Sequence, residues 1–268
     1  MHPIERLRYV ARSSGAPAEV LVRETALALS AFRDDPAGLV TACRRIVARQ
    51  PAIGPIWWLC SRVLCAVDPI REAAAAVEEI ESDATSRHLA ELVADSSRLV
   101  VLGWQPHVAG ALARRGDLSV GVVDVLGEAG SFVDALDHRG VDAWEVPLSG
   151  LGAAVASADL FVVETSALAT GGVVAVSGAR AAAAVARHAG VPVWLVAGVG
   201  RVVPGRIWSH LLGLLDLVDE PWHADDELLP LDLVDDVIGP CGRASVAETL
   251  RRCDCPIAPE LLRSDLGS

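Results

Sequence analysis

The sequence predicts an α/β protein in which a helical amino-terminal domain, residues 1–97, precedes a Rossmann-like domain, residues 98–268. Two observations support this fold class. Before residue 97, apolar residues recur at the three- and four-residue spacing of amphipathic helices. After it, short apolar runs bounded by Gly, Pro, Asp or Ser alternate with stretches of helical length. Strands and helices that alternate at this rhythm form βαβ units and a parallel sheet covered on both faces.

In the first domain, breaks at 13–15, 34–36 and 51–55 divide the chain into four or five helices that pack on one another. Trp57 and Trp58 are adjacent, and neighbouring residues point about 100° apart on a helix. Either one of them lines an interface with the second domain or with a partner chain, or they occupy two faces of a buried helix.

In the second domain, the predicted strands cover 98–103, 118–125, 141–147, 159–165 and 191–198. The helices between them cover 107–115, 129–139, 149–157 and 179–189. The runs are almost continuously apolar, as expected for strands buried on both faces. An irregular tail is expected at the carboxyl end.

Composition excludes several function classes. A net charge of −12 argues against a protein that binds a nucleic-acid backbone, which needs clustered positive charge. All 23 basic residues are arginine, so a Walker A lysine, a Schiff-base lysine and a lysine general base are excluded. Any phosphate must be bound by arginine, backbone N–H groups or hydroxyls.

The sequence shows neither a signal peptide nor an apolar run long enough for a membrane span. The six cysteines are therefore expected to be free thiols in the cytoplasm. Cys253 and Cys255 are spaced too tightly for a usual zinc motif, and no metal is predicted. Because Gly103 is followed by Trp104-Gln105-Pro106 and not by a G-x-G-x-x-G fingerprint, no nicotinamide cofactor is expected either.

Ligands of open parallel sheets bind beyond the carboxyl ends of the strands, so the residues that follow each strand are the candidate site. They converge on one edge of the predicted sheet. The candidate ligand-binding residues are Gly103, Trp104, Asp124, Glu128, Thr165, Gly171, Gly172, Ser177, Gly178 and Arg201.

The stretch T-G-G-V-V-A-V-S-G-A, residues 170–179, opens an alanine-rich helix. Ser177 and Gly178 would place free N–H groups and the positive end of the helix dipole toward an anion. Alternatively, Ser177 is an ordinary N-cap, which stabilises a helix by about 1 kcal/mol.

Two residues are candidates for catalysis. Glu164, at the end of a strand, is a general base or a hydrogen-bonded carboxylate at the edge of the sheet. His107, in the loop after the first strand, is a proton shuttle or simply the first residue of a helix. Asp124 is a ribose-binding position or a solvated strand end.

Residues 51–65 and 98–245 resemble the initiation factor 2B alpha/beta/delta family, which includes exchange-factor regulatory subunits and the isomerases of methylthioribose-1-phosphate and ribose-1,5-bisphosphate. The segments that carry the resemblance are P-A-I-G-P-I-W-W-L-C-S-R-V-L, V-V-E-T-S-A-L-A-T-G-G-V-V-A-V-S-G-A, R-H-A-G-V-P-V-W-L-V-A and L-L-P-L-D-L-V-D-D-V-I-G-P-C-G. The resemblance implies a helical domain before a Rossmann-like domain, and a homodimer.

The functional residues of the isomerases are replaced. Their cysteine after the first strand is absent from G-W-Q-P-H, and their aspartate falls on Glu164 or Thr165. Their asparagine-lysine pair becomes Ala175-Val176, the closing threonine becomes Ala179, and the phosphate-binding arginine is lost within V-L-G-E-A-G. Valine cannot donate hydrogen bonds as lysine does.

Two hypotheses follow. In the first, the protein is a non-catalytic binder or sensor of a small anionic ligand, a sugar phosphate or a nucleotide. In the second, it is a divergent sugar-phosphate isomerase, an aldose-ketose isomerase with Glu164 as base and His107 as acid. The first is favoured because isomerisation also needs phosphate clamps, for which the sequence offers only Arg201, Arg206 and the Ser177-Gly178 pair.

Overall fold

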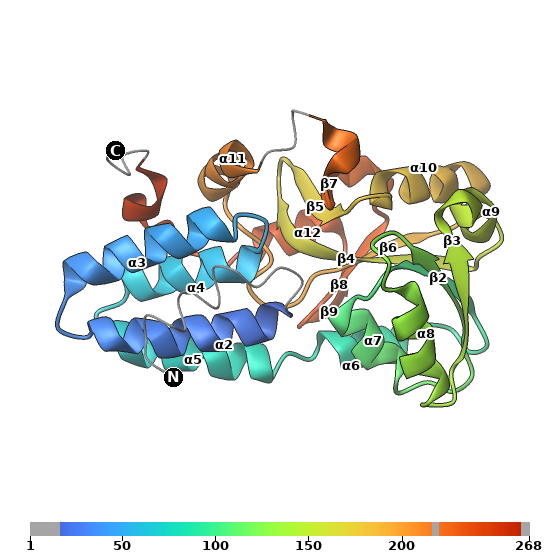
Figure 1. Cartoon of the computed structure of the whole chain (residues 1–268), viewed down its shortest axis with the longest axis horizontal. Helices are drawn as coiled ribbons and strands as arrows, with labels where there is room; N and C mark the ends of the chain where they lie inside the picture. The colour runs from blue at the N-terminus through green and yellow to red at the C-terminus, as the bar shows by residue number, and fades with distance from the viewer. Residues whose placement is uncertain (1–16, 216–219, 264–268) are drawn as a thin grey trace.

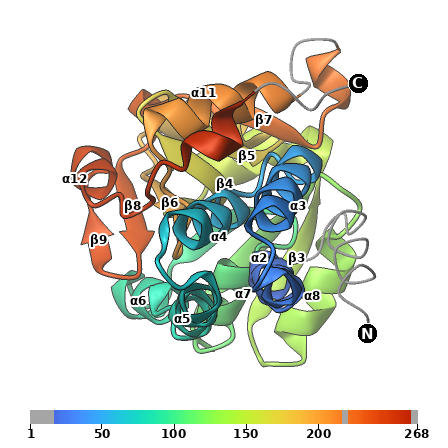
Figure 2. The same ribbon diagram turned by 90° about the vertical axis from the view of Figure 1, so that its left-hand side faces the viewer.

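The computed structural model describes residues 17–215 and 220–263. A group of helices, α2 to α5, lies beside a sheet covered by helices on both faces (Figure 1). Seen from the helical side, these four helices form a bundle in front of the sheet (Figure 2). The bundle helices are α2 (Ala18–Leu29), α3 (Pro36–Arg49), α4 (Gly54–Cys65) and α5 (Pro69–Glu81).

Two of the bundle helices begin at an Asp-Pro pair. The Asp35 carboxylate accepts a hydrogen bond from the Gly38 N–H at 2.9 Å, and Asp68 accepts one from the Arg71 N–H at 3.1 Å. Proline at the first helical position has no N–H to leave unsatisfied. The aspartate caps one of the remaining free N–H groups, which fixes where each helix starts.

Helix α4 is the centre of the bundle, and both of its tryptophans are fully buried. The Trp57 indole N–H donates to the Pro51 carbonyl at 2.9 Å, and its ring meets His210 of α11 edge-on at 5.9 Å. The ring of Trp58 lies under the Arg62 guanidinium at 4.5 Å. Within this chain the two indoles thus occupy two faces of a buried helix, as one of the two alternatives predicted.

Six parallel strands form the main sheet in the order β3-β2-β1-β4-β6-β8, and β9 adds an antiparallel edge. The strands are β1 (Arg98–Leu102), β2 (Ser119–Asp124), β3 (Asp142–Pro147), β4 (Leu160–Ala169), β6 (Val193–Val196), β8 (Asp236–Gly239) and β9 (Gly242–Ala244). The strand order reverses between β1 and β4, which is the position where ligands bind in Rossmann-like sheets. The predicted α/β fold class is confirmed.

Helices cover the two faces of this sheet. One face packs on α9 (Leu151–Ala156) and α10 (Ala179–Ala189) through a core that includes Val155, Phe161 and Ala183. The other packs on α6 (Thr85–Leu92), α7 (Pro106–Leu112) and α8 (Ala129–Asp137). Because α6 covers the sheet although it precedes residue 97, the proposed division at that residue stays a prediction.

Thr170 and Gly171 form the turn of a hairpin, and Gly172 is the first residue of its second strand. Strand β4 continues past the predicted residue 165, and β5 (Gly172–Val176) returns antiparallel to it. Strand β7 (Asp226–Leu229) then pairs with β5. Gly172 has a φ of +137°, which only glycine adopts readily.

Beyond residue 200, where no further strand or helix was predicted, the described chain contains α11 (Gly205–Leu214), the strands β7, β8 and β9, and α12 (Val246–Arg251). A final 3₁₀ turn, Pro259–Leu262, follows. The irregular tail at the carboxyl end stays a prediction. Cys255, Ala258 and Leu261 belong to the same core as Trp57, so the end of the described chain completes the core of the first helices.

Gly171→Ala tests the packing of the hairpin turn. A Cβ at this position would lie 2.4 Å from Nε1 of the buried Trp208. We expect a loss of about 1–3 kcal/mol in the free energy of unfolding, measured by urea denaturation, because the ring has to shift in a packed core.

The matched control is Gly213→Ala in α11, where a Cβ meets nothing within 4 Å. There, alanine should leave stability unchanged or raise it by up to about 1 kcal/mol. Equal stability of the two variants would contradict the packing argument.

Candidate functional site

The candidate site lies at the carboxyl end of β1 and at Glu164, where the parallel pairing of β4 with β6 ends, at the position where the strand order reverses. The loop that follows β1 is tied to β4 by Gln105. Its side-chain amide donates to the Leu102 carbonyl at 3.0 Å, and its carbonyl oxygen accepts the Glu164 N–H at 3.0 Å. The buried amide thus sets the path of the loop, and His107 lies in the first turn of α7.

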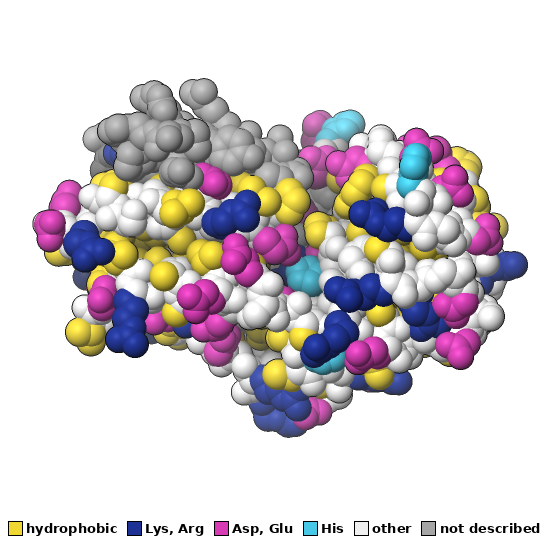
Figure 3. All heavy atoms as spheres, turned by 90° about the horizontal axis from the view of Figure 1, so that it is seen from below, with side chains coloured by type: hydrophobic (Ala, Val, Ile, Leu, Met, Phe, Trp, Pro, Cys, Tyr) yellow, Lys and Arg dark blue, Asp and Glu magenta, His cyan; other side chains and the backbone are white. Residues whose placement is uncertain are grey.

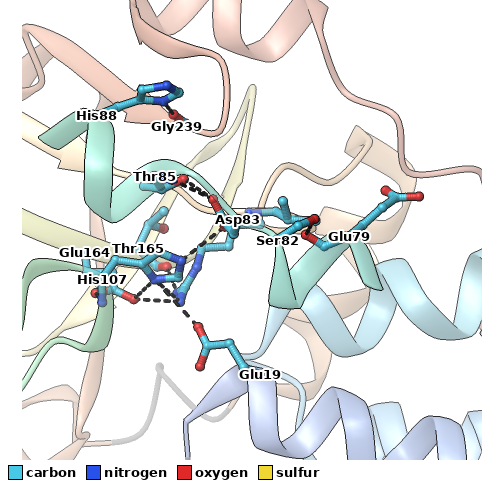
Figure 4. A network of polar contacts seen from close by, with 12 residues as sticks. Glu19, Glu79, Ser82, Asp83, Thr85, His88, His107, Glu164, Thr165 and Gly239 are labelled. Carbon is cyan, nitrogen blue, oxygen red and sulfur yellow. Dashed lines mark hydrogen bonds and ion pairs between the residues drawn. The ribbon is translucent and has the colours of Figure 1, made fainter. Parts of the chain in front are cut away.

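His107 and Glu164 contact each other twice. The His107 N–H donates to Oε2 of Glu164 at 2.9 Å, and Nδ1 of the ring lies 2.9 Å from Oε1 (Figure 4). Arg201 donates from Nη2 to the same Oε1 at 2.6 Å, and from Nη1 to the Thr165 carbonyl. The exposed fraction of all three side chains is below a tenth.

Asp83, in the turn between α5 and α6, binds the other side of the ring. Its Oδ2 lies 3.1 Å from Nε2 of His107 and accepts the Val199 N–H at 2.7 Å. Its Oδ1 accepts the Thr85 N–H at 2.8 Å and the Thr85 hydroxyl at 2.6 Å. One imidazole therefore links the helical bundle to the sheet.

Gly198 makes room for this contact. A Cβ there would lie 2.5 Å from both Oδ2 of Asp83 and Nε2 of His107. No sequence pattern pointed to Asp83 or Gly198. Asp83 follows a helix in the sequence S-D-A-T, which is typical of a local turn, and its long-range contact depends on tertiary packing.

The charges of this network fix its protonation. Burial opposes the imidazolium, but hydrogen bonds to Asp83 and Glu164 outweigh it and raise the pKa of His107 to about 9. Both ring nitrogens therefore donate at neutral pH. The Arg201 guanidinium lies 3.3 Å from Nδ1, and its positive charge lowers the pKa of His107 in part. Glu19 of α2 adds a partly exposed carboxylate at 3.7 Å.

The two buried carboxylates are stabilised in their charged forms. Burial raises the pKa of each, but Arg201 and His107 lower that of Glu164, and His107, Thr85 and the Val199 N–H lower that of Asp83. The net result is a lowered pKa for both. Both oxygens of Glu164 have donors, so the group is held as an ion-paired carboxylate. A general base works best with a pKa near the working pH, and Glu164 is shifted away from it.

The amino end of α10 is already bound by the protein. The Ser177 hydroxyl donates to the Ala224 carbonyl at 2.6 Å, and the Arg180 N–H donates to Oε1 of Glu227 at 2.8 Å. Gly178, with a φ of +95°, occupies the N-cap position. The alternative that Ser177 caps this helix is therefore wrong. A carboxylate of the chain lies where an anion was predicted, and the ligand-binding role of Ser177 and Gly178 stays a prediction.

Of the remaining candidate residues, Gly171 and Gly172 lie away from this edge of the sheet, and the others have the following surroundings. Gly103 and Gly178 both approach the side chain of Val125, because a Cβ on either would lie 3.4 Å from one of its methyl groups. Asp124 accepts the Ala129 N–H at 3.3 Å, while the exposed Glu128 precedes α8 without a side-chain cap bond.

Exposed Trp104 packs on Phe132, with ring centroids 5.1 Å apart. Gly171 and Gly172 do not join this edge. Five residues of β4 follow Glu164 before the turn. At a rise of about 3.3 Å per residue, the two glycines lie roughly 16 Å or more from Glu164 along the strand.

A cavity of about 370 Å³ opens at the carboxyl ends of β6 and β8, beside the Asp83 carboxylate. It is lined by the α5–α6 turn, the loop after β6, the β8–β9 turn and α12. Seen from below, a histidine lies at the waist between the helical half and the sheet half, with acidic side chains on its helical side and arginine side chains on the other (Figure 3). Within residues 17–215 and 220–263 no three His, Cys, Asp or Glu side chains are arranged to hold a metal ion.

The network predicts a pH dependence of stability. A His107 pKa raised from about 6.5 to about 9 stabilises the folded state fully below pH 6.5, and this contribution is lost as the pH rises through 9. At 1.36 kcal/mol per pKa unit, the contribution is about 3 kcal/mol.

Urea denaturation between pH 6 and 9.5 should therefore show a fall in stability that His107→Gln lacks. Direct NMR titration of the His107 ring should give a midpoint near 9. A midpoint near 6.5 would contradict the assigned network.

No protein-family model and no curated protein matches the chain. Solved structures do match. The Pyrococcus horikoshii OT3 translation initiation factor eIF-2B is 13% identical, with a TM-score of 0.77 over 92% of this chain and 98% of that one. The eIF2B beta subunit from Chaetomium thermophilum is 16% identical, with a TM-score of 0.71 over 97% and 91%.

A chain of the tetrameric eIF2B-beta2-delta2 complex from C. thermophilum is 18% identical, with a TM-score of 0.72 over 93% and 92%. These matches span nearly the whole of each chain at low identity. The resemblance found in the sequence is therefore confirmed at the level of structure: this chain has the fold of the eIF2B subunits.

Proposed function

We propose that this protein is a non-catalytic, initiation factor 2B-like ligand-binding protein whose ligand occupies the carboxyl edge of the sheet. The proposal depends on the buried network of His107, Glu164, Asp83 and Arg201 at the position where the strand order reverses, because these side chains bind one another. The groups that an isomerase would need free, Glu164 and His107, are buried and bound by Arg201 and Asp83. The protein would thus be a pseudoenzyme: it keeps the fold, but its buried polar side chains hold the helical bundle and the sheet together and do not catalyse a reaction.

Isomerisation of a sugar phosphate needs one group that takes a proton and another that polarises the carbonyl. His107 and Glu164 are in contact at the right edge of the sheet, and this observation favours the isomerase alternative. The lowered pKa of Glu164 and the absence of the isomerase cysteine from the loop after β1 count against it.

The resemblance suggests a sugar phosphate or a nucleotide as the ligand, with Gly103, Trp104, Asp124 and Glu128 among its contacts. Such an anion needs positively charged donors. Arg201 is engaged with Glu164 and Thr165, whereas Arg206, at the start of α11, is exposed. A cavity also opens at this edge, beside Asp83.

The absence of catalysis is testable by NMR. Pentose phosphates incubated with the protein should give no new aldose or ketose signals over hours. Glu164→Gln should lose about 3 kcal/mol of stability because it removes one charge of a buried pair. Turnover by the wild type that Glu164→Gln abolishes would instead establish the isomerase.

A homodimer in the cytoplasm completes the proposal. One of the matching structures is a tetrameric complex, and the six cysteines of this chain are free thiols, which fits a reducing compartment. None of the helices in the described part of the chain has the length and apolar character that a bilayer crossing requires.

Light scattering after size exclusion should give about twice the chain mass of 28.0 kDa. A mass that stays at one chain up to high micromolar concentration would remove the homodimer from the proposal.

A further inference from the structure

Trp104 is an exposed aromatic side chain at the carboxyl edge of the sheet. It follows β1, and Gly103 before it has a φ of +56°, which turns the chain sharply where the strand ends. The indole packs on the buried ring of Phe132 in α8, with ring centroids 5.1 Å apart and ring planes 33° apart. Its exposed fraction is nevertheless 43%. The indole therefore rests on a fixed support while much of its own surface remains accessible to a ligand.

Asp124 lies in the neighbouring loop, at the end of β2. The Gly103 N–H donates to the Val123 carbonyl at 2.9 Å, so the end of β1 runs beside the end of β2. Oδ1 of Asp124 accepts the N–H of Ala129, the first residue of α8, at 3.3 Å. Within residues 17–215 and 220–263, its Oδ2 has no donor.

The two side chains lie against the same turn of one helix. Ala129, which binds Asp124, and Phe132, which supports Trp104, are three positions apart on α8 and thus lie on the same face. The loop between β2 and α8 is uncovered as well. The Glu128 side chain in it is exposed, and a Cβ at Gly127 would meet nothing within 4 Å.

An exposed indole beside a carboxylate distinguishes between the two ligand classes of the proposed function. Aromatic side chains bind nucleobases by stacking, and a sugar phosphate has no ring to stack. A carboxylate that follows a strand of a Rossmann-like sheet accepts a hydrogen bond from a ribose hydroxyl. Both features of this edge thus suit a nucleoside.

We propose that this edge of the sheet binds the nucleoside part of a nucleotide. The base stacks on the exposed side of Trp104, and a ribose hydroxyl donates to Oδ2 of Asp124. The phosphate points to solvent, because the carboxylates of Asp124 and Glu128 repel it. This inference rests on the proposed function, because it selects one of the two ligand classes of the same site.

Isothermal titration calorimetry of the whole protein with AMP and with ribose 5-phosphate tests the stacking. AMP should bind at least tenfold more tightly, because ribose 5-phosphate lacks the base. Trp104→Leu should weaken AMP binding about tenfold and leave that of ribose 5-phosphate unchanged. Trp104→Phe keeps an aromatic face and should stay within about threefold of the wild type. Urea denaturation checks that both variants are folded.

The ribose contact is tested with adenosine and 2′,3′-dideoxyadenosine. In Asp124→Asn one oxygen still accepts the Ala129 N–H, but an amide NH₂ replaces the second acceptor. The variant should bind adenosine several-fold more weakly than the wild type, and 2′,3′-dideoxyadenosine equally well. Asp137→Asn, at an exposed position near the end of α8, makes the same change of charge and should bind both nucleosides as the wild type does.

Three results would overturn the inference. Equal AMP affinity of the wild type and Trp104→Leu, or tighter binding of ribose 5-phosphate than of AMP, would do so and leave the proposed function standing. Binding of neither AMP nor ribose 5-phosphate would overturn both. A lower mass of Trp104→Leu in light scattering, with unchanged AMP affinity, would identify this surface as an interface between two copies of the chain.

Discussion

A single imidazolium between two carboxylates joins the helical bundle to the sheet. His107 is held by Glu164 of β4 and by Asp83 of the α5–α6 turn, and Arg201 balances the remaining charge. Burying four charged groups costs solvation free energy, which their mutual attraction and hydrogen bonds offset. Removing any one partner leaves an uncompensated charge. The network therefore fixes how the α5–α6 turn sits against β4.

The same network divides the carboxyl edge of the sheet into a filled part and an open part. Beyond β1 and β4, long polar side chains occupy the switch point. Beyond β6 and β8 a cavity of about 370 Å³ stays open, and a Cβ at Gly242, which lines it, would meet nothing within 4 Å. Gly198 also lines this cavity, and its missing side chain makes room for Asp83 beside the histidine. The usual ligand position of a Rossmann-like sheet and the open cavity thus lie next to each other without coinciding.

Much of this fold was predictable because buried parallel strands are nearly continuous apolar runs, and β1, β2 and β3 begin and end within one residue of the predicted bounds. The hairpin of β4 and β5 was missed because residues 170–179 were interpreted as a ligand-binding stretch that opens a helix. The short strands β8 and β9 were missed because they lack a clear alternation. Local pattern does not reveal that a glycine pair packs on Trp208, which comes 37 residues after Gly171.

The site was predictable in part for a topological reason. His107 follows β1, and Glu164 lies where the parallel part of the neighbouring strand β4 ends, so both come to the same edge of the sheet. Asp83 could not be found in this way, because it belongs to a connection between helices and reaches the ring only through tertiary packing. Nor could the sequence reveal that Glu227 already occupies the amino end of α10.

The last described turn, Pro259–Leu262, has a consequence for the order of events during synthesis. Ala258 and Leu261 fill the core around α3 and α4, and Arg44 of α3 binds the Arg263 carbonyl at 2.6 Å. The helices made first on the ribosome therefore wait for residues made some two hundred positions later before their apolar faces are fully covered. Until then the nascent chain exposes hydrocarbon that a chaperone would recognise, although its earliest helices have already emerged.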